Sequence, residues 1–241
     1  MTNATMTLDG QRVVVIGGAT GIGFAVAALA RERGADIVIA SSTPAKIEAA
    51  VERLPGTTGG SVDLRDEANV ARFFETLGAF DHLAVTAGDW GIPLFAAGPD
   101  TDLAAARAGF EVRFWGVLAA VKHASRVIAP TGSITLTSGM LAHRPRKGAP
   151  LVAAIGGAVE YLARGLAVDL APVRVNAVCP GVILTDPVKQ MPQAAVQSFV
   201  AGLPVPRVAT PDEAAMAYVY AMLNRYITGQ ILPVDGGGLL V

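Results

Sequence analysis

The residues 17–23 read Gly-Gly-Ala-Thr-Gly-Ile-Gly and suggest a chemistry more clearly than any other local run of the chain. They follow the β-branched run Arg12–Ile16 and precede the alanine-rich run Phe24–Arg33. A strand, a tight turn and a helix are therefore predicted in succession. Such a turn brings unpaired amide groups and the positive end of a helix dipole toward an anion, which favours phosphate binding.

Three glycines of this turn have separate predicted roles. Gly17 permits the sharp turn, Gly21 lets the backbone approach a pyrophosphate, and Gly23 allows close packing of helix on strand. A simple packing turn is the alternative, but the position in a first βαβ unit favours dinucleotide binding. The remaining predicted binding residues of the turn are Ala19, Thr20 and Ile22.

The choice of dinucleotide is expected at the end of the second predicted strand, where an acid binds the ribose 2′-hydroxyl of NAD. Asp36 opens that strand instead of closing it, so we interpret it as a solvated edge residue. Ser41 and Ser42 follow the strand, and Lys46 is nearby. Hydroxyls and an ammonium suit a 2′-phosphate, so NADP is favoured and NAD remains possible. The alternative is that Ser42 or Thr43, which follows it, is an ordinary N-cap of the next helix.

The rest of the chain alternates short apolar runs with longer amphipathic ones, which indicates βαβ units and a parallel sheet. A length of 241 residues suits one α/β domain. We predict a single-domain doubly wound Rossmann fold over residues 1–241, a seven-stranded parallel sheet with helices on both faces. The predicted strands are Arg12–Ile16, Asp36–Ala40, Gly60–Val62, His82–Thr86, Ser133–Thr137, Val173–Val178 and Ile231–Val234. Helices are predicted at Phe24–Arg33, Thr43–Leu54, Glu67–Leu77, within Leu103–Ala129, within Leu151–Leu170, and at Asp212–Leu223.

One segment, residues 186–207, interrupts this alternation with several prolines around a short apolar helix. Because it follows a strand, it is expected beyond the carboxyl end of the sheet, where a lid over a ligand crevice would lie. The alternative is a surface excursion. Its apolar members Met191, Phe199 and Leu203 suggest a pocket wall for a small-molecule substrate.

Composition excludes several classes of function. The formal charge is −1, from 19 basic and 20 acidic residues, so no basic field for nucleic acid is expected. Cys179 is the single cysteine, which rules out an intrachain disulfide, and His82, His123 and His143 lack metal-ligand spacing. We therefore expect no metal site.

Targeting signals are not apparent either. Residues 1–12 lack a basic and then apolar pattern, so no signal peptide is expected. The uncharged run Val13–Ala30 contains four glycines and is better explained by strand, turn and helix than by a membrane span. We expect a cytoplasmic protein with no membrane association.

Further motifs lie in a specific order along the chain. They are Asp63-Leu64, Ala87-Gly88, Ser138, Asn176, Pro180-Gly181 with Thr185, Arg207 with Pro211 and Glu213, and the run 229–237. With the glycine turn, they make the chain resemble the short-chain dehydrogenase/reductase family nearly from end to end. The resemblance implies hydride transfer between a nicotinamide cofactor and a small alcohol or carbonyl substrate. It also implies a homodimer or homotetramer, in which the small-residue helix from Leu151 onward packs against its symmetry mate.

The resemblance also implies roles for individual residues. Asp63, followed by Leu64, would bind the adenine amino group, and Ala87 and Gly88 would line the adenosine ribose. Ser138 would hydrogen-bond the substrate oxygen, although it could simply be a polar strand end. The nicotinamide amide would be held by Pro180, Gly181, Val182, Ile183 and Thr185.

The family's proton-transfer pair, a Tyr and a Lys four residues later, is missing. Its tyrosine position is Leu151 or Val152 and its lysine position is Ile155 or Gly156, depending on register. Tyr161 lies about 14 Å further along the same helix and on a different face, so it cannot replace the phenol.

The family's asparagine position on the preceding long helix is Arg113, so the serine remains while its usual partners are absent. His143, five residues past Ser138, is one candidate donor because histidine titrates near neutral pH. Its alternative is a solvated basic loop. Arg113 could stabilise an oxyanion or clamp a carboxylate, or it could form a structural ion pair.

Two hypotheses of function follow. The first is an NAD(P)-dependent oxidoreductase with a non-standard proton donor, which we favour. The second is a dinucleotide-binding sensor or silent subunit without turnover. A positioned acid or base contributes about 10²–10⁴-fold in rate, so its loss alone does not abolish hydride transfer between aligned reactants.

Overall fold

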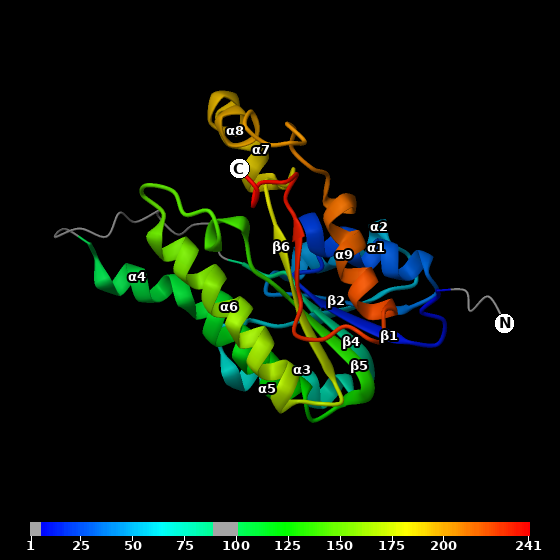
Figure 1. Cartoon of the computed structure of the whole chain (residues 1–241). Helices are drawn as coiled ribbons and strands as arrows, with labels where there is room; N and C mark the ends of the chain where they lie inside the picture. Colours follow the sequence, from blue (N-terminus) through cyan, green and yellow to red (C-terminus); the bar gives the residue numbers. More distant parts are fainter. Residues whose placement is uncertain (1–5, 89–100) are drawn as a thin grey trace.

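The computed structural model describes residues 6–88 and 101–241 as three layers, a parallel sheet with helices on both faces (Figure 1). The strands are β1 (Arg12–Ile16), β2 (Asp36–Ser41), β3 (Thr58–Ser61), β4 (Phe80–Val85), β5 (Ile128–Thr137), β6 (Arg174–Pro180) and β7 (Ile231–Val234). The α-helices are α1 (Gly21–Glu32), α2 (Pro44–Arg53), α3 (Glu67–Leu77), α4 (Leu103–Phe110), α5 (Val117–Ala124), α6 (Pro150–Asp169), α7 (Asp186–Lys189), α8 (Gln193–Val200) and α9 (Pro211–Leu223). A π-helix, η1 (Glu111–Gly116), and a 3₁₀ turn, η2 (Met140–Ala142), complete the described elements.

The strand order is β3-β2-β1-β4-β5-β6-β7, with every pairing parallel. The chain builds the sheet outward from β1 to β3 and then returns to place β4 on the other side of β1. This reversal makes the carboxyl ends of β1 and β4 the topological switch point of the sheet, which is where doubly wound proteins bind their ligands. The predicted fold class is confirmed.

The strands are apolar on both sides because both faces of the sheet are covered. In β1, Val14 and Ile16 face the core formed with α3, α5 and α6, whereas Val13 and Val15 face α1 and α9. All four side chains are buried. Packing against the apolar cores on both faces of the sheet fixes the position and direction of β1. It therefore also fixes the position of the glycine turn that follows β1.

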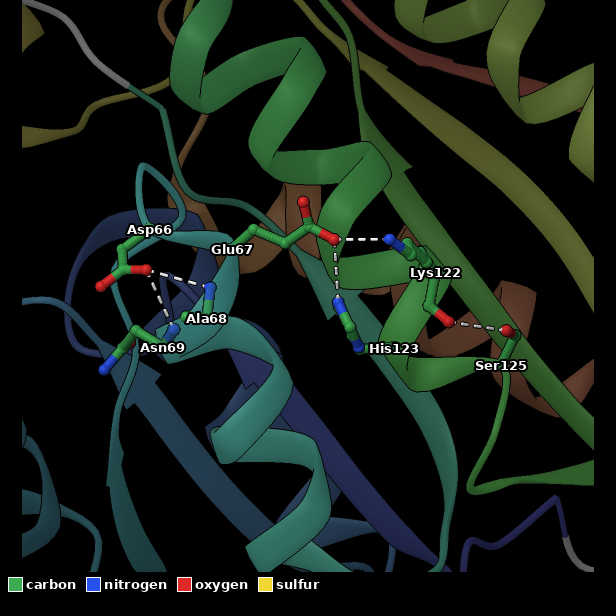
Figure 2. A network of polar contacts seen from close by, with 7 residues as sticks. All are labelled: Asp66, Glu67, Ala68, Asn69, Lys122, His123 and Ser125. Carbon is green, nitrogen blue, oxygen red and sulfur yellow. Dashed lines mark hydrogen bonds and ion pairs between the residues drawn. The ribbon is translucent and has the colours of Figure 1, made fainter.

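The two helices α3 and α5 are joined at their surface by a polar network (Figure 2). The Glu67 carboxylate accepts a hydrogen bond from Lys122 Nζ at 2.6 Å and lies 3.3 Å from His123 Nε2. These contacts lower the pKa of Glu67, with the Lys122 hydrogen bond as the largest cause. Asp66 caps α3 by accepting from the amides of Ala68 and Asn69.

The described structure corrects three details of the predicted elements. The helix expected within Leu103–Ala129 is divided by η1 and ends at Ala124, and residues 128–129 already belong to β5. Strand β3 is placed at 58–61 instead of 60–62. The segment 186–207 carries two short helices, α7 and α8, where one was expected.

Helix α6 is long and apolar enough to cross a membrane by length and composition alone. In the fold, its inward face, including Ile155 and Val159, packs on the sheet beside α5. Its other face exposes Tyr161 and Val168. Burial of one face against β5 and β6 is the behaviour of a helix that covers a sheet.

Candidate active site

The glycine turn lies at the carboxyl end of β1 and is fitted closely against the loop that follows β4. A Cβ atom on Gly17 would come within 2.5 Å of the amide nitrogen of Ala87 and 2.7 Å of Thr86 Oγ1. Gly17 also has φ +87°, a conformation that side chains disfavour. A Cβ on Gly23 would overlap the carbonyl oxygen of Gly17. The turn therefore brings the first amides of α1 into the crevice between β1 and β4 because these positions have no side chains.

The segment that follows β6 closes over the same turn. Thr185 Cγ2 lies 3.1 Å from where a Gly21 Cβ would stand, and Gly181 packs against the backbone of Asp235. The Gly181 amide donates to the carbonyl oxygen of Val234, and Ile183 forms a bridge with Ala209. These contacts place the predicted nicotinamide segment, residues 180–185, directly beside the predicted phosphate segment.

Residues predicted to contact adenosine lie at the carboxyl ends of β2 and β3. Asp63 follows β3, with its amide held by Asn69 and its carboxylate accepting from the amide of Arg65. Ser41 ends β2 and Ser42 is exposed after it. Asp36 pairs with Arg12 at the opposite end of the sheet, at 3.1 Å, so its interpretation as an edge residue is confirmed.

Ser138 follows β5 and heads a chain of hydrogen-bonded side chains that leads toward solvent. Its Oγ donates to Glu160 Oε1 at 2.8 Å and is 3.3 Å from the carbonyl oxygen of Val178. The other carboxylate oxygen, Oε2, lies 2.7 Å from His143 Nε2. The side chain of Glu160 is 3% exposed and that of His143 is 38% exposed. Ser138 and His143 are thus brought together, with Glu160 between them.

Cys179, in β6, lies against this chain. The pKa of its thiol is raised to about 12, mainly by burial and in part by the neighbouring Glu160, and a hydrogen bond with Ser138 opposes this rise. His143, Glu160 and Cys179 place one potential ligand atom each within 4.8 Å of the others. A thiol of this kind is protonated and unreactive as a nucleophile at neutral pH.

Of the two positions expected for the family lysine, Ile155 and Gly156, the second is packed closely against the loop after β5. A Cβ on Gly156 would come within 3.1 Å of Ala142 Cβ and 3.5 Å of the carbonyl oxygen of Gly139. Leu151, Val152 and Ile155 offer no titratable group. Tyr161 is 71% exposed, on the outer face of α6, so it does not replace the missing phenol.

Arg113 lies in η1, and its guanidinium approaches the loop after β4. A Cβ on Gly88 would stand 3.1 Å from Arg113 Nη2 and 3.2 Å from its Nε. The π-helix therefore directs this arginine toward the predicted adenosine segment, residues 87–88, instead of leaving it on a solvated helix face.

Sequence reasoning did not identify Glu160 or Cys179 as site residues. A signal for Glu160 is its spacing: it lies one helical turn after Gly156, on the same inward face as Val159 and Ala163. A single carboxylate on an otherwise apolar face must find polar partners. Nothing in the local sequence of β6 distinguishes Cys179 from an ordinary buried cysteine.

A doubly wound parallel sheet with a glycine turn at its switch point defines a dinucleotide-binding α/β protein. A sequence model described as enoyl-(acyl carrier protein) reductase matches residues 17–238. The short-chain dehydrogenase/reductase malC of Malbranchea aurantiaca is 35% identical, over 97% of this chain and 96% of its own.

Solved structures agree with this result. A small-chain dehydrogenase in complex with NADPH has a TM-score of 0.83 and 38% identity, over 97% of this chain and 100% of its own. MalC reductase/Diels-Alderase from Malbranchea aurantiaca has a TM-score of 0.89 and 34% identity, over 97% and 98% of the two chains. The chain belongs to the short-chain dehydrogenase/reductase family and is an NAD(P)-dependent oxidoreductase. Its substrates are small molecules.

Proposed function

We propose that this protein is an NADPH-dependent reductase of small carbonyl compounds in which Ser138 protonates the substrate oxygen. Glu160 and His143 return the proton to Ser138. The observation that carries this proposal is the buried hydrogen-bonded chain from Ser138 through Glu160 to the partly exposed His143. Through this chain of hydrogen bonds Ser138 can exchange protons with solvent, although the usual tyrosine and lysine are absent from its surroundings.

The cofactor site fits the shape of the turn. Since a Cβ at Gly17 or Gly23 would overlap neighbouring backbone, the amides at the start of α1 are open to a pyrophosphate. We assign the phosphate contacts to the glycine turn, the adenine contact to Asp63 and the nicotinamide amide contacts to residues 180–185. A bound reduced nicotinamide supplies the hydride of the reaction.

The preference for NADPH is supported by the end of β2. Ser41 and Ser42 occupy the position where a carboxylate would select NAD, and the exposed Lys46 lies in the first turn of α2. Two hydroxyls can donate to a 2′-phosphate, and the ammonium balances part of its charge. The NADPH complex of a relative at 38% identity supports the same choice.

Proton transfer follows from the order of the three side chains. As the carbonyl carbon becomes a carbinol carbon, its oxygen takes the proton of Ser138 Oγ. Glu160 carries a replacement proton from His143 to Ser138, and solvent recharges His143. One proton is consumed for each hydride, and each side chain returns to its starting state. Burial of Glu160 makes this transfer effective, because a positioned group in a dry site needs little reorganisation.

Arg113 is proposed to act beside the cofactor. Its guanidinium packs against Gly88, in the segment assigned to the adenosine ribose, so it can donate hydrogen bonds to the cofactor there. Loss of its charge in Arg113→Met is expected to lower kcat/KM.

The segment 186–207 is proposed as a lid over the crevice. It begins directly after Thr185, the residue that precedes α7, and α8 lies beyond the carboxyl ends of the strands (Figure 1). The Arg146 guanidinium lies 4.1 Å above the ring of Phe199, so α8 is held against the loop that carries His143.

Assembly into a homodimer or homotetramer is proposed from the outer face of α6 and its neighbourhood. Tyr161, Val168 and, on η1, Trp115 are large apolar side chains more than half exposed. Covering them with a second copy removes apolar surface from water.

The experiment that tests this function is a steady-state screen of NADPH and NADH oxidation with ketones, aldehydes and quinones. Reduction of at least one carbonyl, with a lower KM for NADPH than for NADH, is the expected result. Tight NADPH binding with no reduction of any carbonyl would contradict the proposal.

A further inference from the structure

We infer that His143, Glu160 and Cys179 form a binding site for a thiophilic divalent cation of the Zn²⁺ type, which competes with proton transfer. These side chains come from three different elements: the loop after η2, helix α6 and strand β6. They are the only group of three potential metal ligands of this kind within residues 6–88 and 101–241.

The spacing of the ligand atoms suits a small cation. His143 Nε2 and Glu160 Oε2 are 2.7 Å apart, and the sulfur of Cys179 completes a triangle with no side above 4.8 Å. Tetrahedral zinc, with bonds of about 2.0–2.3 Å, separates its ligand atoms by roughly 3.3–3.6 Å. Binding therefore requires the His143–Glu160 contact to widen and the sulfur to approach the other two ligand atoms.

The ligand set selects the kind of cation. One sulfur, one imidazole nitrogen and one carboxylate oxygen suit zinc and similar ions, whereas Mg²⁺ and Ca²⁺ prefer oxygen ligands alone. Three protein ligands leave a fourth position open, which is the arrangement of accessible zinc sites. Ser138 Oγ is bonded to the other oxygen of the Glu160 carboxylate, Oε1, at 2.8 Å.

Charge and access are consistent with occupation of the site. A thiolate and a carboxylate together balance a doubly charged cation, so the buried site becomes neutral. A bound cation supplies the positive charge that a thiolate at this buried position needs. Entry is from the side of His143, whose side chain is the exposed member of the three.

Binding of a cation at this site would inhibit carbonyl reduction, and this consequence rests on the proposed function. A cation held by Glu160 and His143 takes away the acceptor of Ser138 and the path that reprotonates it. Reversible inhibition of carbonyl reduction by micromolar Zn²⁺, relieved by a chelator, is therefore expected. Binding itself requires neither nucleotide nor substrate.

The first experiment measures binding alone. The full chain, without nucleotide, is titrated with Zn²⁺ against a chromophoric chelator and, separately, with Cd²⁺ while the ultraviolet charge-transfer band of a cadmium thiolate is recorded. One equivalent of Zn²⁺ and a thiolate band that saturates at one equivalent of Cd²⁺ are expected. A wild-type protein that shows no thiolate band overturns the inference, and this result needs no variant to fold.

Variants then locate the site. Cys179→Ala is expected to abolish the cadmium band and weaken Zn²⁺ binding at least tenfold, and His143→Gln to weaken it by a similar factor. His123→Gln is the matched control, because His123 also lies beside a glutamate, Glu67, at 3.3 Å but belongs to the α3–α5 network. Unchanged Zn²⁺ affinity in Cys179→Ala overturns the inference. Carbonyl reduction measured in excess chelator tests the proposed function separately, so the two can fail independently.

Discussion

Replacement of Glu160 by Gln is the most informative single perturbation of the proposed proton path. The two side chains have nearly the same shape, but the amide carries no charge and cannot pass a replacement proton from His143 to Ser138. The native carboxylate is 3% exposed and contacts Ser138 at 2.8 Å and His143 at 2.7 Å. The substitution therefore removes the proton path while leaving the local packing in place.

The magnitude follows from the role assigned to the carboxylate. A positioned general acid or base contributes about 10²–10⁴-fold, so kcat for Glu160→Gln should fall by at least about 100-fold, or about 2.7 kcal/mol of transition-state stabilisation. Ser138 keeps its second partner, the Val178 carbonyl oxygen at 3.3 Å, so it remains in place. KM for the carbonyl and the affinity for NADPH should change less than threefold.

The assay compares two glutamate variants by the loss of nicotinamide absorbance with an active carbonyl substrate. Glu67→Gln is the matched control, since Glu67 also contacts a histidine but joins α3 to α5 (Figure 2). Calorimetry with NADPH and thermal unfolding check that both proteins are folded. A Glu160→Gln enzyme with a kcat within threefold of wild type, and a normal fold, would refute the proton path through Glu160.

Four other predictions test separate parts of the account. His143→Ala should lower kcat roughly tenfold, which is less than the effect of Glu160→Gln because solvent reaches this end of the proton path. Added imidazole should restore part of the activity. A variant with unchanged kcat that does not respond to imidazole would contradict the role of His143. Ser42→Asp should shift the preference toward NADH, measured as the ratio of kcat/KM for the two coenzymes; an unchanged ratio would contradict the assignment of the 2′-phosphate site. Gly23→Ala should abolish NADPH binding in calorimetry, and retention of wild-type affinity would contradict the cradle geometry. Light scattering should give a multiple of the 24.7 kDa chain mass, whereas a mass near 24.7 kDa would contradict assembly.

The stability of the fold should depend on pH through His82. It is 3% exposed, with Nδ1 facing Ser133 Oγ at 2.8 Å and Nε2 facing Gln11 Oε1 at 2.6 Å. Burial, and secondarily the charge of Arg174, lowers its pKa from 6.5 to about 4.

The sign of this effect follows from proton linkage. Between these two pKa values the unfolded chain is protonated at His82 and the native chain is not, so the free energy of unfolding falls as pH falls through this window. We expect a loss of about 3 kcal/mol between pH 6.5 and 4, and urea denaturation at several pH values would measure it. A His82→Gln variant with the same slope of stability against pH would assign the effect to other groups.

The sequence predicted the sheet because its signals are local and redundant. The strand Arg12–Ile16 and the helix Glu67–Leu77 are observed as predicted, since each has the hydrophobic period of its type and a clear end signal. The end of the helix before Ile128 was harder to predict because no glycine or proline separates the helix from the strand that follows it. The π-helix at Glu111–Gly116 has no periodic signature of its own.

The candidate site was predictable only in part. The glycine turn and Ser138 could be placed because both follow predicted strands, whose carboxyl ends must meet at one edge of the sheet. The partner of Ser138 could not be named, because Glu160 is 22 residues away and reaches it only through the packing of α6 on β5. For the same reason, His143, Glu160 and Cys179 gave no metal-ligand spacing in the sequence, although the fold brings them within 4.8 Å.

The most direct test of the central claim follows an isotope from coenzyme to product. The wild-type enzyme is supplied with NADPH carrying deuterium at the transferable position and with a carbonyl substrate, in the presence of a chelator. The account predicts one deuterium on the new carbinol carbon for each NADPH oxidised, at a rate that falls by at least about 100-fold in Glu160→Gln. NADPH oxidation without deuterated alcohol, or equal rates of label transfer in the two proteins, would contradict it.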